Sequence, residues 1–264
     1  MEVTDTHCHL NFDSFDNDRN EVLMRARGAN VFRILNPGIN LESCKSAIKL
    51  SEDYPEVYAA VGIHPNEAGG YSKKILAELR SMAQHPKVIA IGEIGLDYYR
   101  NKTPIHWQKK LFRMQLDLAG ELGLPVVIHN REATNDILNI LDLWVQDLRG
   151  SGSALIERPG VLHSFSGSAL DASRSVELGL KIGITGPITF KNSQQLHKVV
   201  SDTDLGHVLI ETDAPFLTPH PYRGKRNEPS RVVYIAQKIS LIKNIPVEIV
   251  ANITTRNAAD TFHW

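Results

Sequence analysis

Cysteine is scarce in this sequence of 264 residues, since only Cys8 and Cys44 occur and they lie far apart. A disulfide scaffold or a thiolate zinc site needs more cysteines at closer spacing, so the sequence favours neither. Few cysteines are typical of proteins in a reducing compartment, and the first residues carry no signal-peptide pattern. We therefore expect a cytoplasmic location.

Long hydrophobic runs and a strong net charge are also missing. No run approaches the roughly 18 apolar residues of a membrane-spanning helix, so no membrane partner is expected. The 29 Lys and Arg residues nearly balance the 30 Asp and Glu residues, so affinity for a polyanion must come from local clusters. Hydrophobic residues make up 42% of the chain, which is enough for the core of a single domain over residues 1–264. A monomer is the default expectation.

Short β-branched runs alternate with amphipathic stretches along the whole chain. The predicted strands are Glu2–Asp5, Val31–Leu35, Val57–Val61, Val88–Gly92, Pro125–Ile128, Gly160–Leu162, Leu180–Ile184 and His207–Ile210. Strand and helix patterns that alternate eight times predict an α/β fold, a (β/α)₈ TIM barrel. A doubly wound open sheet is the alternative, but metal-ligand residues after widely separated strands favour a closed barrel.

The stretches between the strands place apolar residues at three- and four-residue intervals, the period of a helix. The predicted helices are Arg19–Arg27, Glu42–Asp53, Ser72–His85, Pro104–Leu122, Thr134–Leu148, Ala169–Leu178, Gln194–Val200, Pro229–Lys243 and Val247–Phe262. Thr103 is the expected N-cap of the fourth helix, with Pro104 in its first turn, and Gly123 is expected to end it.

Residues that bind metals follow several of the predicted strands. The set is His7, His9, Glu93, His129, His163 and Asp213. The carboxyl ends of parallel barrel strands meet on one face, so we expect these side chains to lie together. Nitrogen and oxygen donors suit zinc, manganese, iron or nickel, whereas magnesium prefers oxygen. Each residue alone has a plainer explanation, such as core packing or a helix cap, and the prediction depends on the whole set.

Spacing adds detail to this prediction. His7 and His9 are two residues apart on an extended strand, so both imidazoles should point the same way and Cys8 the opposite way. Glu93 has two carboxylate oxygens and can bridge two cations. Glu211 and Asp213 should share one side, and we favour Asp213 as the ligand because it lies nearer the carboxyl-terminal mouth.

At these residues the chain resembles the TatD family of metal-dependent deoxyribonucleases. The matching segments run in order over essentially the whole chain: Asp5–Leu10, Gly62–Pro65, Gly92–Asp97, Ile128–His129, His163–Gly167, Glu211–Pro215 and Arg223–Pro229. Two local departures are Asn130-Arg131-Glu132, where the family often has serine, arginine and aspartate, and Asn66, where histidine is common. They change neighbours of the ligands and not the ligands.

The resemblance implies a hydrolase of DNA phosphodiesters, a 3′–5′ exonuclease on single-stranded or frayed ends that uses a metal-activated water. It implies two divalent ions, Mg²⁺ or Mn²⁺ for activity, with Zn²⁺ or Ni²⁺ as further candidates for the bound ions. One ion would be held by His7, His9, Glu93 and Asp213, and the other by Glu93, His129 and His163. Asp213 would accept a proton. His64 would line the pocket without being a ligand; a plain turn histidine before Pro65 is the alternative.

Positive charge and tyrosine are expected beside the metal residues. The predicted substrate contacts are Tyr98, Arg100, Arg131, Arg223, Lys225, Arg226 and Asn227. Arginine forms paired hydrogen bonds with phosphate, and tyrosine offers a stacking face to unpaired bases. For any one of these loops the alternative is a solvated run of charges. Nothing here reads base edges, so no sequence preference is expected.

Two other functions fit parts of the pattern. A small-molecule amidohydrolase or lactonase uses the same dinuclear barrel, but related barrels often bridge their metals with a carboxylated lysine where this chain has Glu93. The rim rich in arginine and tyrosine also favours a polyanion over a small neutral ring. A non-catalytic metal-binding protein is the second alternative, and the complete ligand set argues against it.

Overall fold

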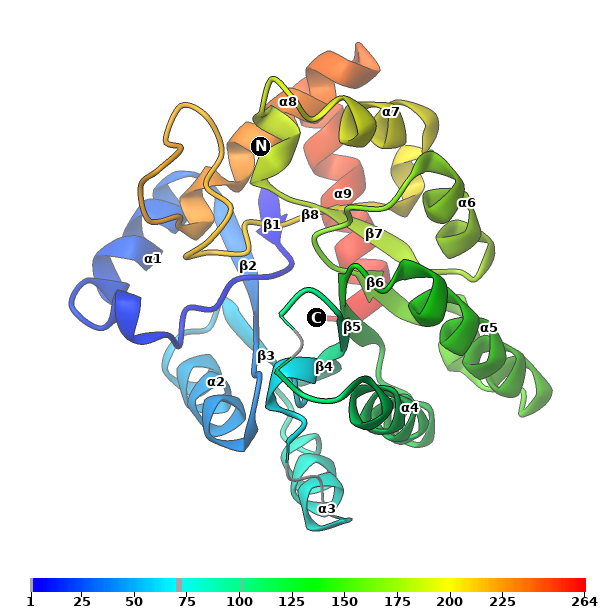
Figure 1. The fold of residues 1–264 in the computed structure, drawn as a ribbon. Coiled ribbons are helices and arrows are strands. Elements are labelled where there is room, and N and C mark those ends of the chain that lie inside the picture. Colours follow the sequence, from blue (N-terminus) through cyan, green and yellow to red (C-terminus); the bar gives the residue numbers. More distant parts are fainter. Residues whose placement is uncertain (1, 70–72, 101) are drawn as a thin grey trace.

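A computed structural model describes residues 2–69, 73–100 and 102–264. Eight parallel strands follow one another in sequence order around a barrel, and the helices lie outside it (Figure 1). The strands are β1 (Val3–Asp5), β2 (Val31–Pro37), β3 (Val57–Val61), β4 (Val88–Asp97), β5 (Val126–Arg131), β6 (Gly160–Leu162), β7 (Lys181–Ile184) and β8 (Val208–Ile210). The predicted TIM barrel is confirmed.

Helices occur where the sequence predicts them. They are α1 (Arg19–Gly28), α2 (Leu41–Asp53), α3 (Lys73–Met82), α4 (Ile105–Leu122), α5 (Thr134–Gly150), α6 (Ala169–Glu177), α7 (Gln194–Asp202), α8 (Val232–Lys243) and α9 (Val247–Phe262). The predicted start of the third helix at Ser72 lies outside the described residues. None of the helices in the described ranges is long and apolar enough to cross a membrane.

The predicted cap of α4 is wrong by one residue. Pro104 is the N-cap, with φ −52° and ψ 136°, and no side chain caps the helix. Thr103 lies too early to cap it, and the Thr103 carbonyl accepts a hydrogen bond from the side chain of Gln108 at 2.7 Å. The predicted end is confirmed, because Gly123 closes α4 in the left-handed conformation, with φ 66°.

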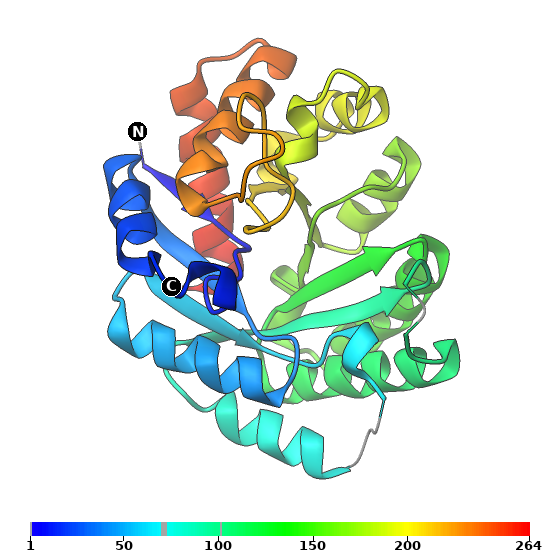
Figure 2. The same ribbon diagram turned by 60° about the vertical axis from the view of Figure 1, so that its left-hand side comes forward.

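Two apolar layers hold the barrel together. The larger core joins the outward faces of the strands to the surrounding helices. A smaller cluster takes residues from six strands, together with Ala258 and Phe262 of α9; the strand residues are Leu35, Ala60, Ile89, Ala90, Val127, Val161 and Leu209. Figure 2 shows α9, in red, beside the blue strand β1. This packing leaves the carboxyl ends of the strands for the polar residues.

The first and last strands meet just beyond their carboxyl ends. The backbone N–H of Thr6 donates to Ile210 O at 3.2 Å, that of Asp213 to His7 O at 2.8 Å, and that of His9 to Ala214 O at 2.8 Å. Cys8 and Ala214 form an isolated parallel bridge. The barrel therefore closes through the residues that carry three of the predicted ligands.

Strand β4 is longer than predicted. It continues from Val88 through Glu93 to Asp97, and all ten residues are buried. Its extension pairs with β5, with Gly95 opposite His129. A Cβ atom on Gly95 would overlap the His129 carbonyl oxygen, and Gly95 has φ +143°. The prediction ended the strand at Gly92 because a carboxylate usually marks the end of a buried run, but Glu93 finds its partners inside the barrel.

Candidate metal centre

The six predicted ligands come together at the carboxyl end of the barrel. His7 and His9 follow β1, Glu93 and His129 lie on β4 and β5, and His163 and Asp213 follow β6 and β8. His7, His9, Glu93 and His163 are at most 5% exposed. Cys8 is buried in the core, and the Nε2 atoms of His7 and His9 lie 3.2 Å apart, so both imidazoles point into the same site as their spacing predicts.

Two carboxylate oxygens lie near the ring nitrogens of His7 and His9. His7 Nε2 and His9 Nε2 are 3.2 Å apart, and each lies 3.5 Å from Glu93 Oε2 and 3.7 Å from Asp213 Oδ1. Ligands at roughly 2.0–2.2 Å from a tetrahedral cation are about 3.3–3.6 Å from one another. His7, His9 and Asp213 form a group that could hold one divalent cation, and Glu93 Oε2 lies 3.5 Å from both histidine nitrogens.

The other oxygen of Glu93 faces a second group. Glu93 Oε1 lies 2.9 Å from His129 Nδ1, 3.3 Å from His163 Nε2 and 3.6 Å from His64 Nε2. One carboxylate thus has one oxygen in each group of donors. This is the arrangement by which a single side chain can serve two cations.

His64 differs from the other histidines of the metal centre in its hydrogen bonding. His64 Nδ1 accepts the backbone N–H of Asn66 at 3.1 Å, and burial lowers the pKa of His64 to about 3. A neutral imidazole that accepts at Nδ1 carries its proton on Nε2, the atom that points towards Glu93. In this tautomer His64 is a hydrogen-bond donor towards Glu93, although His64, Glu93 and His129 also form a group that could hold a metal ion.

The electrostatics of the centre favour positive charge between the carboxylates. Burial acts to raise the pKa of Glu93, but His64, His163 and His129 outweigh it and leave that pKa well below its usual range. Burial acts to lower the pKa of His163. The carboxylates of Glu93 and Glu211 outweigh this effect and raise the pKa of His163 well above its usual range. A cation bound here would take over the positive charge that protonated imidazoles otherwise supply.

Asp97 is a residue of the site that the sequence did not single out. Its Oδ2 lies 3.3 Å from His129 Nε2 and accepts Asn66 Nδ2 at 2.9 Å, and its Oδ1 accepts the backbone N–H of Arg100 at 2.8 Å. A carboxylate behind a metal-binding imidazole fixes the ring and its tautomer. Asp97 lies in the matching segment Gly92–Asp97. Because the predicted strand ended at Gly92, the sequence did not show that Asp97 lies beside His129.

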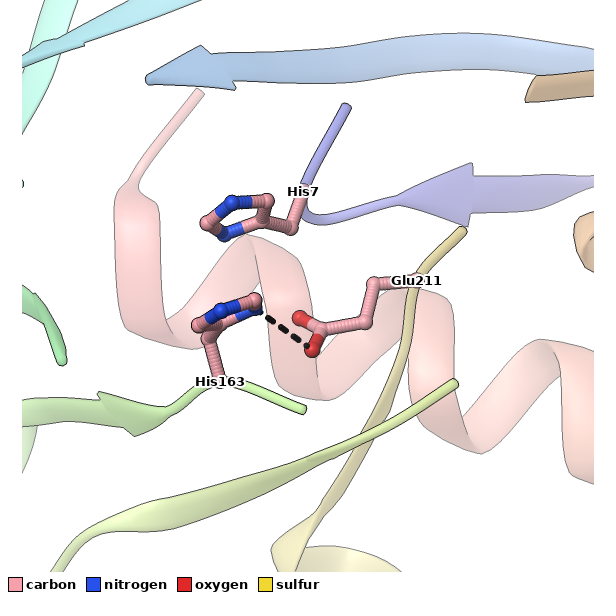
Figure 3. A group of neighbouring side chains, drawn as sticks. All are labelled: His7, His163 and Glu211. Carbon is pink, nitrogen blue, oxygen red and sulfur yellow. Dashed lines mark ion pairs between the residues drawn. The ribbon is translucent and has the colours of Figure 1, made fainter. Parts of the chain in front are cut away.

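Glu211 holds a second imidazole in the same way. The rings of His7 and His163 stack with centroids 3.8 Å apart, and Glu211 reaches His163 Nδ1 at 3.4 Å (Figure 3). Glu211 also accepts hydrogen bonds from Thr6 Oγ1 at 3.2 Å and from the backbone N–H of Ser164 at 2.5 Å. Glu211 thus orients His163, while Asp213 faces the other group of donors.

Replacing Asp97 with asparagine should lower the affinity for metal on the order of 10- to 100-fold, because the His129 ring loses its carboxylate partner. The measurement is a calorimetric titration of metal-free protein with Zn²⁺ or Mn²⁺. Asp142→Asn, at an exposed position of α5, is the control and should titrate like the parent protein. Equal affinities for Asp97→Asn and the parent would remove Asp97 from the site.

Four of the predicted substrate contacts are exposed cations at the same end of the barrel. They are Arg100, Arg131, Arg223 and Lys225. The Arg131 guanidinium lies 4.3 Å from the centre of the Tyr99 ring, and that of Arg223 lies 4.4 Å from the Phe190 ring. Stacking on a ring restricts a guanidinium without using its hydrogen-bond donors.

The structure gives the other three predicted contacts different partners. Tyr98 donates its hydroxyl to Asp136 Oδ2 at 2.6 Å. Arg226 is ion-paired with Asp18 at 2.6 Å, which ties the loop after β8 to the start of α1. Asn227 is fully buried, and its amide nitrogen donates to Thr212 O and Phe216 O. These side chains bind other parts of the protein, and their contacts with a substrate stay predictions.

Comparison with known proteins places this site in a family. A family model described as TatD related DNase matches residues 4–263. The chain belongs to the TatD family. This TatD-family hydrolase is 42% identical to the Bacillus subtilis protein named uncharacterized metal-dependent hydrolase YabD, over 98% of both chains. It is 33% identical to the Salmonella typhimurium protein named 3′-5′ ssDNA/RNA exonuclease TatD, over 98% of both chains.

A solved structure agrees with this assignment. The crystal structure of the TatD homologue YjjV from Escherichia coli superimposes with a TM-score of 0.91 and 31% identity, covering 99% of this chain and 98% of that one. This TatD-family chain is therefore a metal-dependent hydrolase, and its buried His, Glu and Asp groups are able to hold metal.

Proposed function

We propose that this TatD-family hydrolase cleaves phosphodiester bonds of DNA, as a 3′–5′ exonuclease on single-stranded or frayed ends. The observation that supports this most is the placement of Glu93, with one oxygen among His7, His9 and Asp213 and the other beside His129 and His163. Pairs of divalent cations are typical of nucleases and phosphatases. Relatives named as single-stranded DNA and RNA exonucleases support the same substrate class.

We assign His7, His9, Glu93 and Asp213 to one cation and Glu93, His129 and His163 to the other. Mg²⁺ or Mn²⁺ is proposed for activity, and the four histidines make Zn²⁺ and Ni²⁺ further candidates for the bound ions. Divalent cations bound there would supply Lewis-acid chemistry, lowering the pKa of a water and neutralising charge on phosphoryl oxygens.

Asp213 and His64 are the side chains that would handle protons. Burial raises the pKa of Asp213 above its usual value, which makes its carboxylate a better proton acceptor near neutral pH. The backbone N–H of Asp213 bonds to His7 O, so this carboxylate is held at the closure of the barrel. His64 presents an Nε2 proton to the pocket and would donate a hydrogen bond to charge that develops on phosphate.

The substrate strand would run over the exposed cations. Arg131 follows the ligand His129 on β5, and Arg223 and Lys225 lie on the loop that follows Asp213. Contacts of these side chains with phosphate carry no sequence information, so binding should depend on salt and not on base identity. Monomeric state and cytoplasmic location stay predictions of the sequence.

End-labelled oligonucleotides test this function. Single-stranded DNA incubated with the protein and Mg²⁺ or Mn²⁺ should shorten from its 3′ end, and a chelator should stop the reaction. Single-stranded RNA in the same assay measures the preference for the sugar. Hydrolysis of lactones or dihydropyrimidines, with oligonucleotides left intact, would show a small-molecule hydrolase instead.

A further inference from the structure

A series of aromatic rings leads from the metal centre to the surface. The ring of His9 stacks on Phe12, with centroids 4.6 Å apart and planes 14° from parallel. Phe12 in turn meets Phe216 edge to face, with centroids 6.2 Å apart. Two successive ring contacts therefore connect a predicted metal ligand to Phe216.

Phe216 is an exposed ring on a fixed backbone. The residue is 52% exposed. Its N–H donates to Asp213 O at 2.8 Å, and its carbonyl accepts from the side chain of the buried Asn227 at 2.7 Å. These two hydrogen bonds hold the backbone of Phe216, so its exposed ring keeps a defined position on the loop that follows Asp213.

Two other rings near the mouth carry a guanidinium on one face. The Arg131 guanidinium lies over Tyr99, and that of Arg223 lies over Phe190. The ring contact that the described residues give Phe216 is the edge-to-face contact with Phe12. Phe216 is 52% exposed and lies three residues after the predicted ligand Asp213, so its ring is available to a substrate bound at the metal centre.

We propose that Phe216, supported by Phe12, is a stacking platform for the nucleobase of the strand's terminal nucleotide. This rests on the proposed function. A base is one sugar away from its phosphate, so a phosphate at the metal centre places the base over neighbouring residues. Stacking accepts every base because each has a π face, and it needs a base that is not paired. The platform would therefore select unpaired ends without selecting a sequence.

The test compares oligonucleotides that carry either a normal or an abasic 3′-terminal nucleotide. The parent protein should show a KM roughly tenfold lower for the strand with the base. Phe216→Ala should lose this difference by raising the KM for the normal strand, with kcat little changed. Phe216→Tyr keeps a flat ring and should retain the difference, whereas Phe216→Leu should not.

Phe32→Ala is the matched control. Phe32 is also an exposed phenylalanine, at 46%, but it lies at the amino end of β2. This variant should keep the tenfold difference, and thermal unfolding should show that every variant folds. A base preference that survives in Phe216→Ala overturns the platform.

A binding measurement separates this proposal from the proposed function. Metal-loaded protein is titrated calorimetrically with deoxyadenosine 5′-monophosphate and with 2-deoxyribose 5-phosphate. If the parent protein binds the nucleotide more tightly than the sugar phosphate, and Phe216→Ala loses this difference, the platform is supported. If no oligonucleotide is cleaved in that case, only the nuclease function is wrong. Cleavage of DNA together with equal binding of the two phosphates leaves the function standing and removes the platform.

Discussion

Glu93→Ala should abolish hydrolysis and lower the occupancy of both metal positions. Each carboxylate oxygen of Glu93 lies in a different group of donors, so one substitution removes a ligand from both. The loss in turnover should be at least about 10³-fold, the scale of losing a major electrostatic contribution to the transition state. Steady-state hydrolysis and elemental analysis of metal per protein measure the two effects.

A surface glutamate provides the control for this experiment. Glu42 is exposed at the start of α2, and Glu42→Ala should keep both the metal content and the activity of the parent protein. Glu93→Gln keeps the size of the side chain and removes its charge, so it separates loss of charge from loss of shape. A Glu93→Ala protein that retained two ions and normal turnover would show that Glu93 does not bridge them.

Gly95→Ala should destabilise the fold on the order of 3 kcal/mol or more, and lower Tm by roughly 6–12 °C. Gly95 has φ +143°, and a Cβ atom there would overlap the His129 carbonyl oxygen. The strain falls on the pairing of β4 with β5, so the same substitution should displace His129 and weaken metal binding. Thermal unfolding and a metal titration test the two parts.

Gly28→Ala is the comparison for this substitution. Gly28 ends α1, and a Cβ atom there meets nothing within 4 Å. Its effect on stability should stay within about 1 kcal/mol. If Gly95→Ala unfolded at the same temperature as Gly28→Ala, the β4–β5 contact would be looser than the structure indicates.

The barrel could be predicted because the sequence patterns that mark its strands and helices are local. Runs such as Val57–Val61 and Gly160–Leu162 have the bounds that the sequence predicts, since short apolar runs between helix patterns mark buried parallel strands. The convergence of the six predicted ligands follows from the same rule, because parallel strands in a barrel end on one face.

The missed features depend on partners that are distant in sequence. Glu93 continues a strand because imidazoles from other strands meet its carboxylate, and no local pattern shows this. The roles of Asp97 and Asn227 follow from hydrogen bonds to His129 and to the backbone carbonyls of Thr212 and Phe216. The sequence also does not reveal that Asp18 pairs with Arg226.

The closure of the barrel also bears on how the protein is made. Ile210, which accepts the N–H of Thr6, is 204 residues further along the chain. A nascent polypeptide that emerges amino end first therefore holds His7 and His9 long before Asp213 is synthesised. During translation the predicted ligand set is incomplete until Asp213 has been added, so we expect prematurely terminated products that lack β8 and Asp213 to be inactive.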